Sequence, residues 1–256
     1  MHIGAITDYI DVAQIVLYAF WFFFIGLIVY LRREDKREGY PLESDRSNER
    51  VQVQGFPRMP PPKTFKLAHG GEVTVPRPEA AQHVAAEPAE LWPGAPLVPT
   101  GDAMTDGVGP ASYAQRSNAP DLTFEGHPRI VPMRVATDFT VESRDPDPRG
   151  MPVFAGDDRL GGMVHDVWVD RSEPQIRYLE IEVAASGRHV LVPIAFVRFD
   201  GLNRCVHVTS IMSGQFAGVP ALGNPDQVTL LEEDRISAYF AGGTLYAEPS
   251  RLGPLL

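Results

Sequence analysis

An apolar stretch of twenty residues near the N-terminus, from Val12 to Leu31, constrains this chain more than any other feature. Its sequence is VAQIVLYAFWFFFIGLIVYL, and Gln14, near one end, is its one strongly polar residue. Twenty helical residues rise about 30 Å, which matches the thickness of the hydrocarbon core of a bilayer. The stretch therefore predicts a transmembrane helix over residues 12–31.

Two other interpretations of the stretch fit less well. A secretory signal peptide has a positively charged start, a shorter apolar core and a cleavage site of small residues. Here the preceding residues, MHIGAITDYID, contain no Lys or Arg, and Leu31 is followed by RREDKRE. A buried core helix stays open as an alternative, although the length and the aromatic content favour a membrane span.

The basic residues next to the stretch all lie on its C-terminal side: Arg32, Arg33, Lys36 and Arg37. The positive-inside rule then puts residues 1–11 in the periplasm and residues 32–256 in the cytoplasm of a bacterial inner membrane. We expect the helix to continue to about Glu38, because Gly39 and Pro41 follow it.

The foot of this helix is expected to contact lipid. Tyr30 lies at the depth where aromatic rings meet the interface. Arg32, Arg33 and Lys36 follow at once, and cations there attract anionic headgroups.

Residues 39–106 are predicted to form an extended, proline-rich surface segment. Eleven of the 24 prolines lie between Pro41 and Pro99, and they interrupt every periodic pattern. Scattered large apolar residues favour a chain that lies on another surface, while a disordered linker stays open. Within it, KTFKLAHGGEVTVP predicts one hairpin with His69-Gly70-Gly71 as its turn.

Residues 107–256 are predicted to form a mainly-β domain, an antiparallel sheet curled into a barrel, with a C-terminal helix. The expected strands are Val164–Val169, Arg177–Val183, His189–Pro193 and Arg204–Thr209. DRSEPQ and Gly201-Leu202-Asn203 are the expected turns. Period-two alternation puts Leu179, Ile181 and Val183 on one face, and Tyr178, Glu180 and Glu182 on the other.

The C-terminal helix has a predicted start and end. Asn224 suits the N-cap, Pro225 suits the first helical position, and Gln227 completes a capping box. The helix is expected to run through VTLLEEDRISAYF and to end at Gly242-Gly243.

Charge and motif content exclude several function classes. The net charge of −10, from 33 acidic and 23 basic residues, argues against a nucleic-acid partner. A single cysteine, Cys205, excludes an intrachain disulfide and a Cys₄ or Cys₂His₂ zinc site. The nucleotide-binding, metalloprotease and serine-hydrolase motifs are absent from the sequence, and no two of the seven histidines have i, i+4 spacing. We therefore predict no catalytic residues. His189 and His207, in presumed strands, are interpreted as structural or solvated.

The remaining chemistry is proton handling, which needs carboxylates, imidazoles and water in a partly desolvated place. The turn from Asp170 to Pro174, followed by Arg177, groups two acids and two bases, and a solvated hairpin turn is the plainer alternative. Glu125 and His127, two residues apart in FEGHPR, form a second cluster that could share a proton or a metal ion; the alternative is a surface loop.

Six motifs, in order along nearly the whole chain, resemble the H subunit of the purple-bacterial photosynthetic reaction centre. They are YAFWFFFIGLIVYL with REDKREGYPLE, PKTFKLAHG, PTGDAMTDGVGPASY, IVPM, VWVDRSEPQIRYLEIEV and PDQVTLLEEDRISAYFAGGTLYA. The core of the C-terminal part also looks like a PRC barrel.

This resemblance implies an accessory, non-enzymatic subunit of the intracytoplasmic membrane whose partners are the L and M subunits and membrane lipids. A cytochrome subunit and a light-harvesting ring are possible further partners. The complex would carry bacteriochlorophyll, bacteriopheophytin, quinones, non-haem iron and carotenoid, none of them ligated by this chain. The implied role is to stabilise the core, shield the quinones and route protons to the secondary quinone.

The resemblance also implies site residues. Glu173 matches the family's inner proton-route glutamate, Asp170 its acidic neighbour and Arg177 a charge that tunes them. His127 matches a surface histidine at the proton entrance, where metal ions can bind. Glu125 and Thr123 stand where a histidine and an aspartate occur in some members, which puts tight metal binding at His127 in doubt.

Two other functions are weighed against this one. A membrane-tethered PRC-barrel adaptor would recruit a soluble partner and move no protons, but it would not need the proline-rich segment. A membrane-anchored enzyme would need a catalytic constellation, and the sequence offers none.

Overall fold

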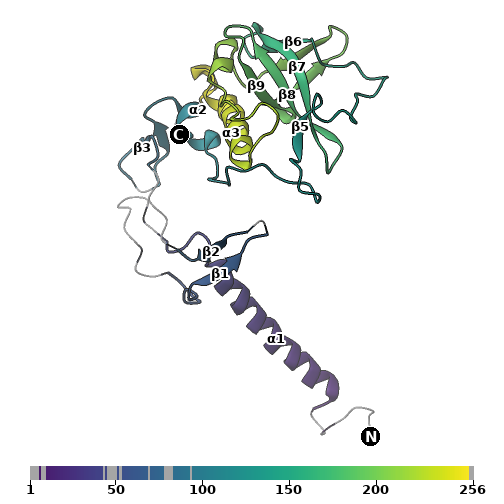
Figure 1. Ribbon diagram of the computed structural model, residues 1–256. Helices are drawn as coiled ribbons and strands as arrows, with labels where there is room; N and C mark the ends of the chain where they lie inside the picture. Colours follow the sequence, from purple (N-terminus) through teal and green to yellow (C-terminus); the bar gives the residue numbers. More distant parts are fainter. Residues whose placement is uncertain are drawn as a thin grey trace. The chain divides into compact units, whose positions relative to one another are not determined.

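The computed structural model describes residues 6, 10–42, 44, 51, 54–68, 70–77, 83–92 and 94–253. They belong to two compact units, Met1–Gln82 with Trp92–Gly94, and His83–Leu91 with Ala95–Leu256. Figure 1 gives the element labels. The domain boundaries at 39, 106 and 107 remain predictions.

The first unit is built on the long helix α1, Val12–Asp35 (Figure 1). Asp11 and Gln14 form a capping box at its start, each side chain accepting from the other's backbone N–H. None of its residues is buried, and its most apolar window has a mean hydropathy of 2.4. By length and composition the helix fits a single-pass membrane anchor.

The helix ends at Asp35, so the expectation that it continues to about Glu38 is wrong. The backbone N–H groups of Arg37 and Glu38 reach back three residues, to Glu34 and Asp35, in a tightened last turn. Lys36 leaves the helical conformation there, with φ −72° and ψ 7°, and its side chain turns to backbone carbonyls outside the helix.

Two short hairpins lie in the proline-rich segment. In the first unit, β1 (Lys63–Lys66) pairs antiparallel with β2 (Glu72–Val75), which confirms the predicted hairpin. His69 of the predicted turn lies outside the described residues. In the second unit, β3 (Ala86–Pro88) pairs with β4 (Leu97–Pro99).

The second unit contains a sheet of seven strands. The strands are β5 (Ile130–Pro132), β6 (Pro152–Ala155), β7 (Leu160–Asp170), β8 (Gln175–Val183), β9 (His189–Pro193), β10 (Arg198–Asp200) and β11 (Cys205–Val208). Their order is β10-β11-β6-β7-β8-β9, and β5 also pairs with β7. Figure 1 shows the sheet curled, with the C-terminal helix beside it. The predicted mainly-β fold with its four strands is confirmed.

One pairing departs from the prediction of an antiparallel sheet, because β11 runs parallel to β6. The two strands are far apart in the sequence, so no tight turn forces them to run in opposite directions.

Both faces of β8 are buried along its centre. Leu179 and Ile181 face the main core, as expected. Tyr178 and Glu180, predicted to lie on the other face, are also buried, at 3% and 4% exposed. Tyr178 is covered because its hydroxyl meets Glu233 of the C-terminal helix.

The C-terminal helix α3, Leu230–Tyr246, begins five residues later and ends later than predicted. Thr229 and Glu232 form the capping box, whereas the Asn224 side chain accepts from the Asp226 N–H in a turn. Gly242 and Gly243 lie inside the helix.

The two glycines permit close packing rather than ending the helix. A Cβ at Gly242 would lie 2.5 Å from the Cβ of Ala111, and one at Gly243 would lie 2.5 Å from the Ser210 carbonyl oxygen. Ala111 belongs to the 3₁₀ helix η1, Gly109–Ala111, which follows the short helix α2, Ala103–Asp106.

Among the described residues, three further 3₁₀ helices belong to the second unit. They are η2 (Ile194–Phe196), η3 (Ser213–Gly218) and η4 (Pro249–Arg251).

Candidate functional site

The turn between β7 and β8 is organised by the carboxylate of Asp170. Its Oδ1 accepts hydrogen bonds from the backbone N–H groups of Ser172, at 2.9 Å, and Glu173, at 3.1 Å. Asp170 is 1% exposed. The same carboxylate therefore fixes the backbone of Glu173, the residue that the family resemblance gives as the proton-route glutamate.

Arg129 neutralises this carboxylate, with Nε 2.9 Å from both oxygens of Asp170. The contact follows from the register, because Ile130 of β5 lies opposite Asp170 of β7. Burial acts to raise the pKa of Asp170, but the hydrogen bonds from Arg129 and from the turn hold that pKa below its ordinary value. Asp170 is therefore a fixed negative charge near neutral pH.

Arg129 also connects Asp170 to two other acids. Its Nη1 lies 3.3 Å from Asp121 and its Nη2 lies 3.5 Å from Glu173. The side chain of Glu173 is 68% exposed. One guanidinium thus contacts a buried carboxylate, Asp170, a partly exposed one, Asp121, and an exposed one, Glu173.

A buried acid lies close to this network. Glu233 of α3 accepts a hydrogen bond of 2.9 Å from the Tyr178 hydroxyl and is 9% exposed. Burial raises the pKa of Glu233 above its ordinary value, and the negative charge of Asp121 adds to this, while Arg177 acts to lower it. Arg177 is half-buried, and its charge acts on Glu233.

The second predicted cluster lies on a tight turn over residues 123–127. The Thr123 N–H donates to the His127 carbonyl oxygen at 2.8 Å, and the His127 N–H donates to the Thr123 hydroxyl at 3.4 Å. Hydrogen bonds from its own backbone and from the Thr123 hydroxyl hold the pKa of Glu125 below its ordinary value. Glu125 and His127 are both exposed.

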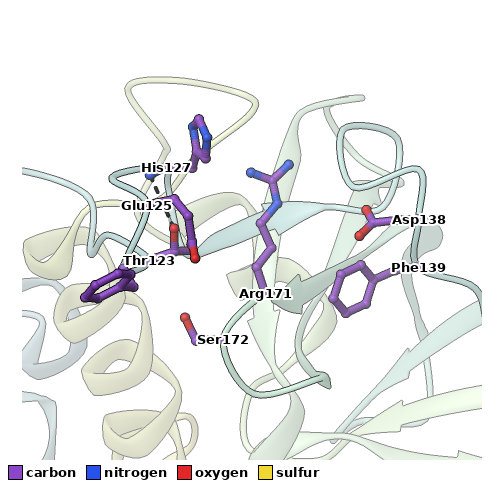
Figure 2. Close-up of a pocket in the computed structure, with 8 residues that line it drawn as sticks. Thr123, Glu125, His127, Asp138, Phe139, Arg171 and Ser172 are labelled. Atoms are coloured by element: carbon purple, nitrogen blue, oxygen red, sulfur yellow. Dashed lines mark hydrogen bonds between the residues drawn. The ribbon is translucent and has the colours of Figure 1, made fainter.

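An open pocket of about 810 Å³ joins the two predicted clusters (Figure 2). Its lining consists of Thr123, Phe124, Glu125, His127, Asp138, Phe139, Arg171 and Ser172. Figure 2 shows Glu125 and His127 on one side of Arg171, and Asp138 and Phe139 on the other. The structure thus brings the 123–127 turn beside the β7–β8 turn, although the two are more than forty residues apart.

The predicted metal ligand His127 belongs to neither of the two groups of three potential metal ligands among the described residues. Those groups are His165-Glu180-His189 and Asp200-Cys205-His207. A metal site at His127 stays a prediction.

The prediction that Lys36 contacts lipid is wrong, because this side chain is buried, at 2% exposed. Its ammonium group donates to the carbonyl oxygens of Gln54 at 2.7 Å, Gly55 at 3.1 Å and Pro57 at 2.7 Å. All three ammonium hydrogens are used, so none is free for a headgroup.

The other predicted lipid contacts are compatible with their positions. Tyr30, Arg32 and Arg33 are exposed at the foot of α1, and Arg32 pairs with Asp35 at 3.5 Å. Contact with lipid stays a prediction for these three.

Sequence reasoning missed Arg129, Asp121 and Glu233. Arg129 and Asp121 are far from Asp170 along the chain, so no local spacing connects them. Glu233 carried a signal, because it lies three and seven residues before the buried Ile236 and Phe240, on the same face of α3.

Two family models match this chain. One, described as the photosynthetic reaction centre, H-chain N-terminal region, matches residues 4–135, which is more than half of the 256 residues. The other, described as the PRC-barrel domain, matches residues 140–209. Both agree with the resemblance seen in the sequence motifs and with the apolar helix and β-rich body of the fold. The chain therefore belongs to the family of photosynthetic reaction-centre H subunits, accessory components that associate with the other subunits of that complex.

Proposed function

We propose that this chain stabilises the L and M subunits, shields their quinones from water and conducts protons from the cytoplasm to the secondary quinone. The observation that supports proton conduction is the pocket of about 810 Å³ lined by Glu125, His127, Arg171 and Ser172. It gives water a place between the exposed acid-and-imidazole turn and the turn that carries Glu173.

In this proposal the residues of the route have different tasks. His127 and Glu125 collect protons, since both are exposed on the lining of the pocket and a charged carboxylate attracts cations. Asp170 keeps its charge and holds the turn through its bonds to Ser172 and Glu173. Glu173, which is 68% exposed in this chain, passes the proton towards the partner subunits.

The positive charges of two arginines, Arg129 and Arg177, act on the acids of the site. Arg129 contacts Asp170 and Glu173, and it favours the charged form of Asp170. Arg177 acts on the buried Glu233, whose raised pKa brings it nearer to working pH. Glu233 is therefore a further candidate to hold a proton beside the route.

The membrane anchor has its own part in the proposal. The basic residues at the C-terminal end of α1 favour an N-terminus in the periplasm and a cytoplasmic second unit. Arg32, Arg33 and Tyr30 would contact anionic headgroups, with about 1 kcal/mol for each cation. A variant with Arg32 and Arg33 both changed to Gln should retain less anionic lipid on purification; equal retention would remove this part of the proposal.

The experiment that tests proton conduction is Glu173→Gln, with flash-induced proton uptake and the second reduction of the secondary quinone as readouts. Both rates are expected to fall about tenfold, which corresponds to about 1.4 kcal/mol of barrier, while the complex assembles normally. The matched control is Glu182→Gln, which changes an exposed glutamate on β8, the strand that follows the turn. Unchanged rates in Glu173→Gln would sink the assignment.

Absorption of the copurifying material separates this role from the adaptor alternative. A C-terminally tagged chain extracted in mild detergent should bring bacteriochlorophyll bands that bleach reversibly under light. A colourless preparation with a different partner would favour the adaptor.

A further inference from the structure

Three potential metal ligands from three neighbouring strands meet on one face of the sheet. His165 lies on β7, Glu180 on β8 and His189 on β9, and their ligand atoms all lie within 4.8 Å of one another. The two imidazole rings are 4.3 Å apart between centroids, and Nδ1 of His189 lies 2.6 Å from Oε1 of Glu180. We propose that these three side chains bind a divalent transition-metal ion such as Zn²⁺.

A β-bulge brings His165 to this face. Val164 pairs with Ile181 and Asp166 with Glu180, so His165 is an extra residue without a partner on β8. A bulge changes the direction of a side chain, and here it brings the His165 ring to the face of the sheet that carries Glu180. On the other side of β8, His189 pairs with Glu182, which shares the face of Glu180 because it is two residues away.

Hydrogen bonds to one of its two carboxylate oxygens hold Glu180 in place. Its Oε2 accepts hydrogen bonds from Nη1 of Arg134 at 2.6 Å and from the indole Nε1 of Trp168 at 2.8 Å. Oε1 is left to face His189. A carboxylate oriented by such outer partners is the usual arrangement at protein metal sites, because it limits the freedom lost on binding.

Three carboxylates lie beside the two imidazoles. Arg134 is shared among the carboxylates of Asp166, Glu180 and Asp226, at 3.1, 2.6 and 3.3 Å. Arg149 also acts on Asp166, and Arg188 lines the pocket beside Glu180. Both histidines are exposed, and a pocket of about 230 Å³ opens next to Glu180 and His189, so an ion and its remaining water ligands can reach the site.

The donor set selects the class of ion. Two imidazoles and one carboxylate suit Zn²⁺, Ni²⁺ or Cu²⁺, whereas Mg²⁺ and Ca²⁺ prefer oxygen ligands. Ligand atoms about 2.0–2.1 Å from zinc stand about 3.3 Å apart in a tetrahedron. The Nδ1–Oε1 contact of 2.6 Å must therefore lengthen, which the exposed His189 ring can do by a small rotation.

Zinc binding to the purified complex tests the proposal, with free Zn²⁺ varied by equilibrium dialysis. His165→Gln and His189→Gln should each weaken one zinc site at least tenfold. His127→Gln and His207→Gln are matched controls, because they remove an exposed histidine at the proton-route pocket and the histidine of the Asp200-Cys205-His207 group. Both controls should retain the site that the first two variants lose.

The result that would overturn the proposal is zinc affinity unchanged in both test variants, or lost in a control variant instead. Electron paramagnetic resonance of Cu²⁺ on the unaltered complex gives a second measurement that needs no variant to fold. Coupling to two imidazole nitrogens is expected at this site, falling to one in each test variant. A bound Cu²⁺ that couples to fewer than two nitrogens in the unaltered complex would contradict the proposal.

Discussion

Two clusters in the second unit have the same composition of charge, one arginine shared among three carboxylates, and yet they differ in burial. The carboxylates around Arg129 are those of Asp121, Asp170 and Glu173. The carboxylates around Arg134 are those of Asp166, Glu180 and Asp226. In the first, the Asp170 side chain is 1% exposed and that of Glu173 68% exposed. In the second, two of the three are 6% exposed.

This difference indicates what each cluster can do. Glu173 faces water, and its contact with Arg129 is 3.5 Å long. Glu180 is held in its charged form, since Arg134, Trp168 and His189 all bond to its carboxylate. Although burial acts to raise the pKa of Glu180, those hydrogen bonds hold it below its ordinary value. The first cluster suits proton exchange, and the second suits a fixed structural or ion-binding role.

The largest expected effect comes from removing the cation of the more buried cluster. Arg134→Met leaves Asp166 and Glu180 buried without their cation, which typically costs about 3–5 kcal/mol. The lower end applies here, since the Arg134 side chain is 35% exposed. The thermal midpoint of the complex should fall by several degrees. Arg198→Met, at an exposed arginine of β10, is the control and should change little. An unchanged midpoint in Arg134→Met would mean that water already compensates these acids.

Asp170→Asn should have the next largest effect, about 1.5–3 kcal/mol, because it weakens charge-assisted hydrogen bonds. The pKa of Asp170 is lower in the folded protein than in the unfolded chain. Its contribution is therefore fully present above the unfolded value of about 3.9 and is lost as pH falls through the lower folded value.

The measurement is thermal stability of both proteins against pH. The difference between them should be constant from pH 8 to about pH 5 and should shrink below about pH 4. A difference that already disappears at pH 6 would contradict the pairing with Arg129.

Glu233→Gln tests the buried acid beside the first cluster. Its expected effect on stability is smaller than that of Asp170→Asn and depends on pH in the opposite direction. The pKa of Glu233 is raised on folding, so the stability of the unaltered protein should fall as pH rises from about 4.3 through the folded value. Glutamine avoids this loss and can still accept from the Tyr178 hydroxyl. The variant should match the original near pH 4 and exceed it at pH 8 by up to about 1 kcal/mol. A variant less stable than the original at pH 8 would show that Glu233 is stabilised as a carboxylate.

Much of the fold could be predicted from local patterns, and the predictions that were wrong have a common cause. Alternation found β7 and β8, and turn residues found the connections between strands. The predicted start of α3 was wrong because Asn224 and Thr229 both stand at the beginning of a sequence that suits a helix N-cap. Tertiary contacts select Thr229: Val228 is 2% exposed, and the Leu230 N–H donates to the Ala119 carbonyl oxygen at 3.0 Å.

The candidate site shows the same limit. Asp170 and Glu173 share one turn, so the sequence displayed them together. Arg129 comes from another strand, and only the pairing of β5 with β7 brings it to Asp170. Lys36 was misread because a cation after an apolar helix has the same sequence signature whether it faces lipid or bonds to carbonyls of its own chain.

The smallest expected change in stability is that of Glu173→Gln, and it decides whether the two clusters differ as proposed. Glu173 is 68% exposed, and its contact with Arg129 is 3.5 Å. Exposed ion pairs contribute about 0–1 kcal/mol, so the thermal midpoint should stay within experimental error while proton uptake slows. Asp170→Asn is the comparison, since it changes the other acid of the same turn and should lower the midpoint. If Glu173→Gln lowered the midpoint as much as Asp170→Asn, Glu173 would be a structural partner of Arg129, and slower proton uptake in that variant could no longer be assigned to a lost proton carrier.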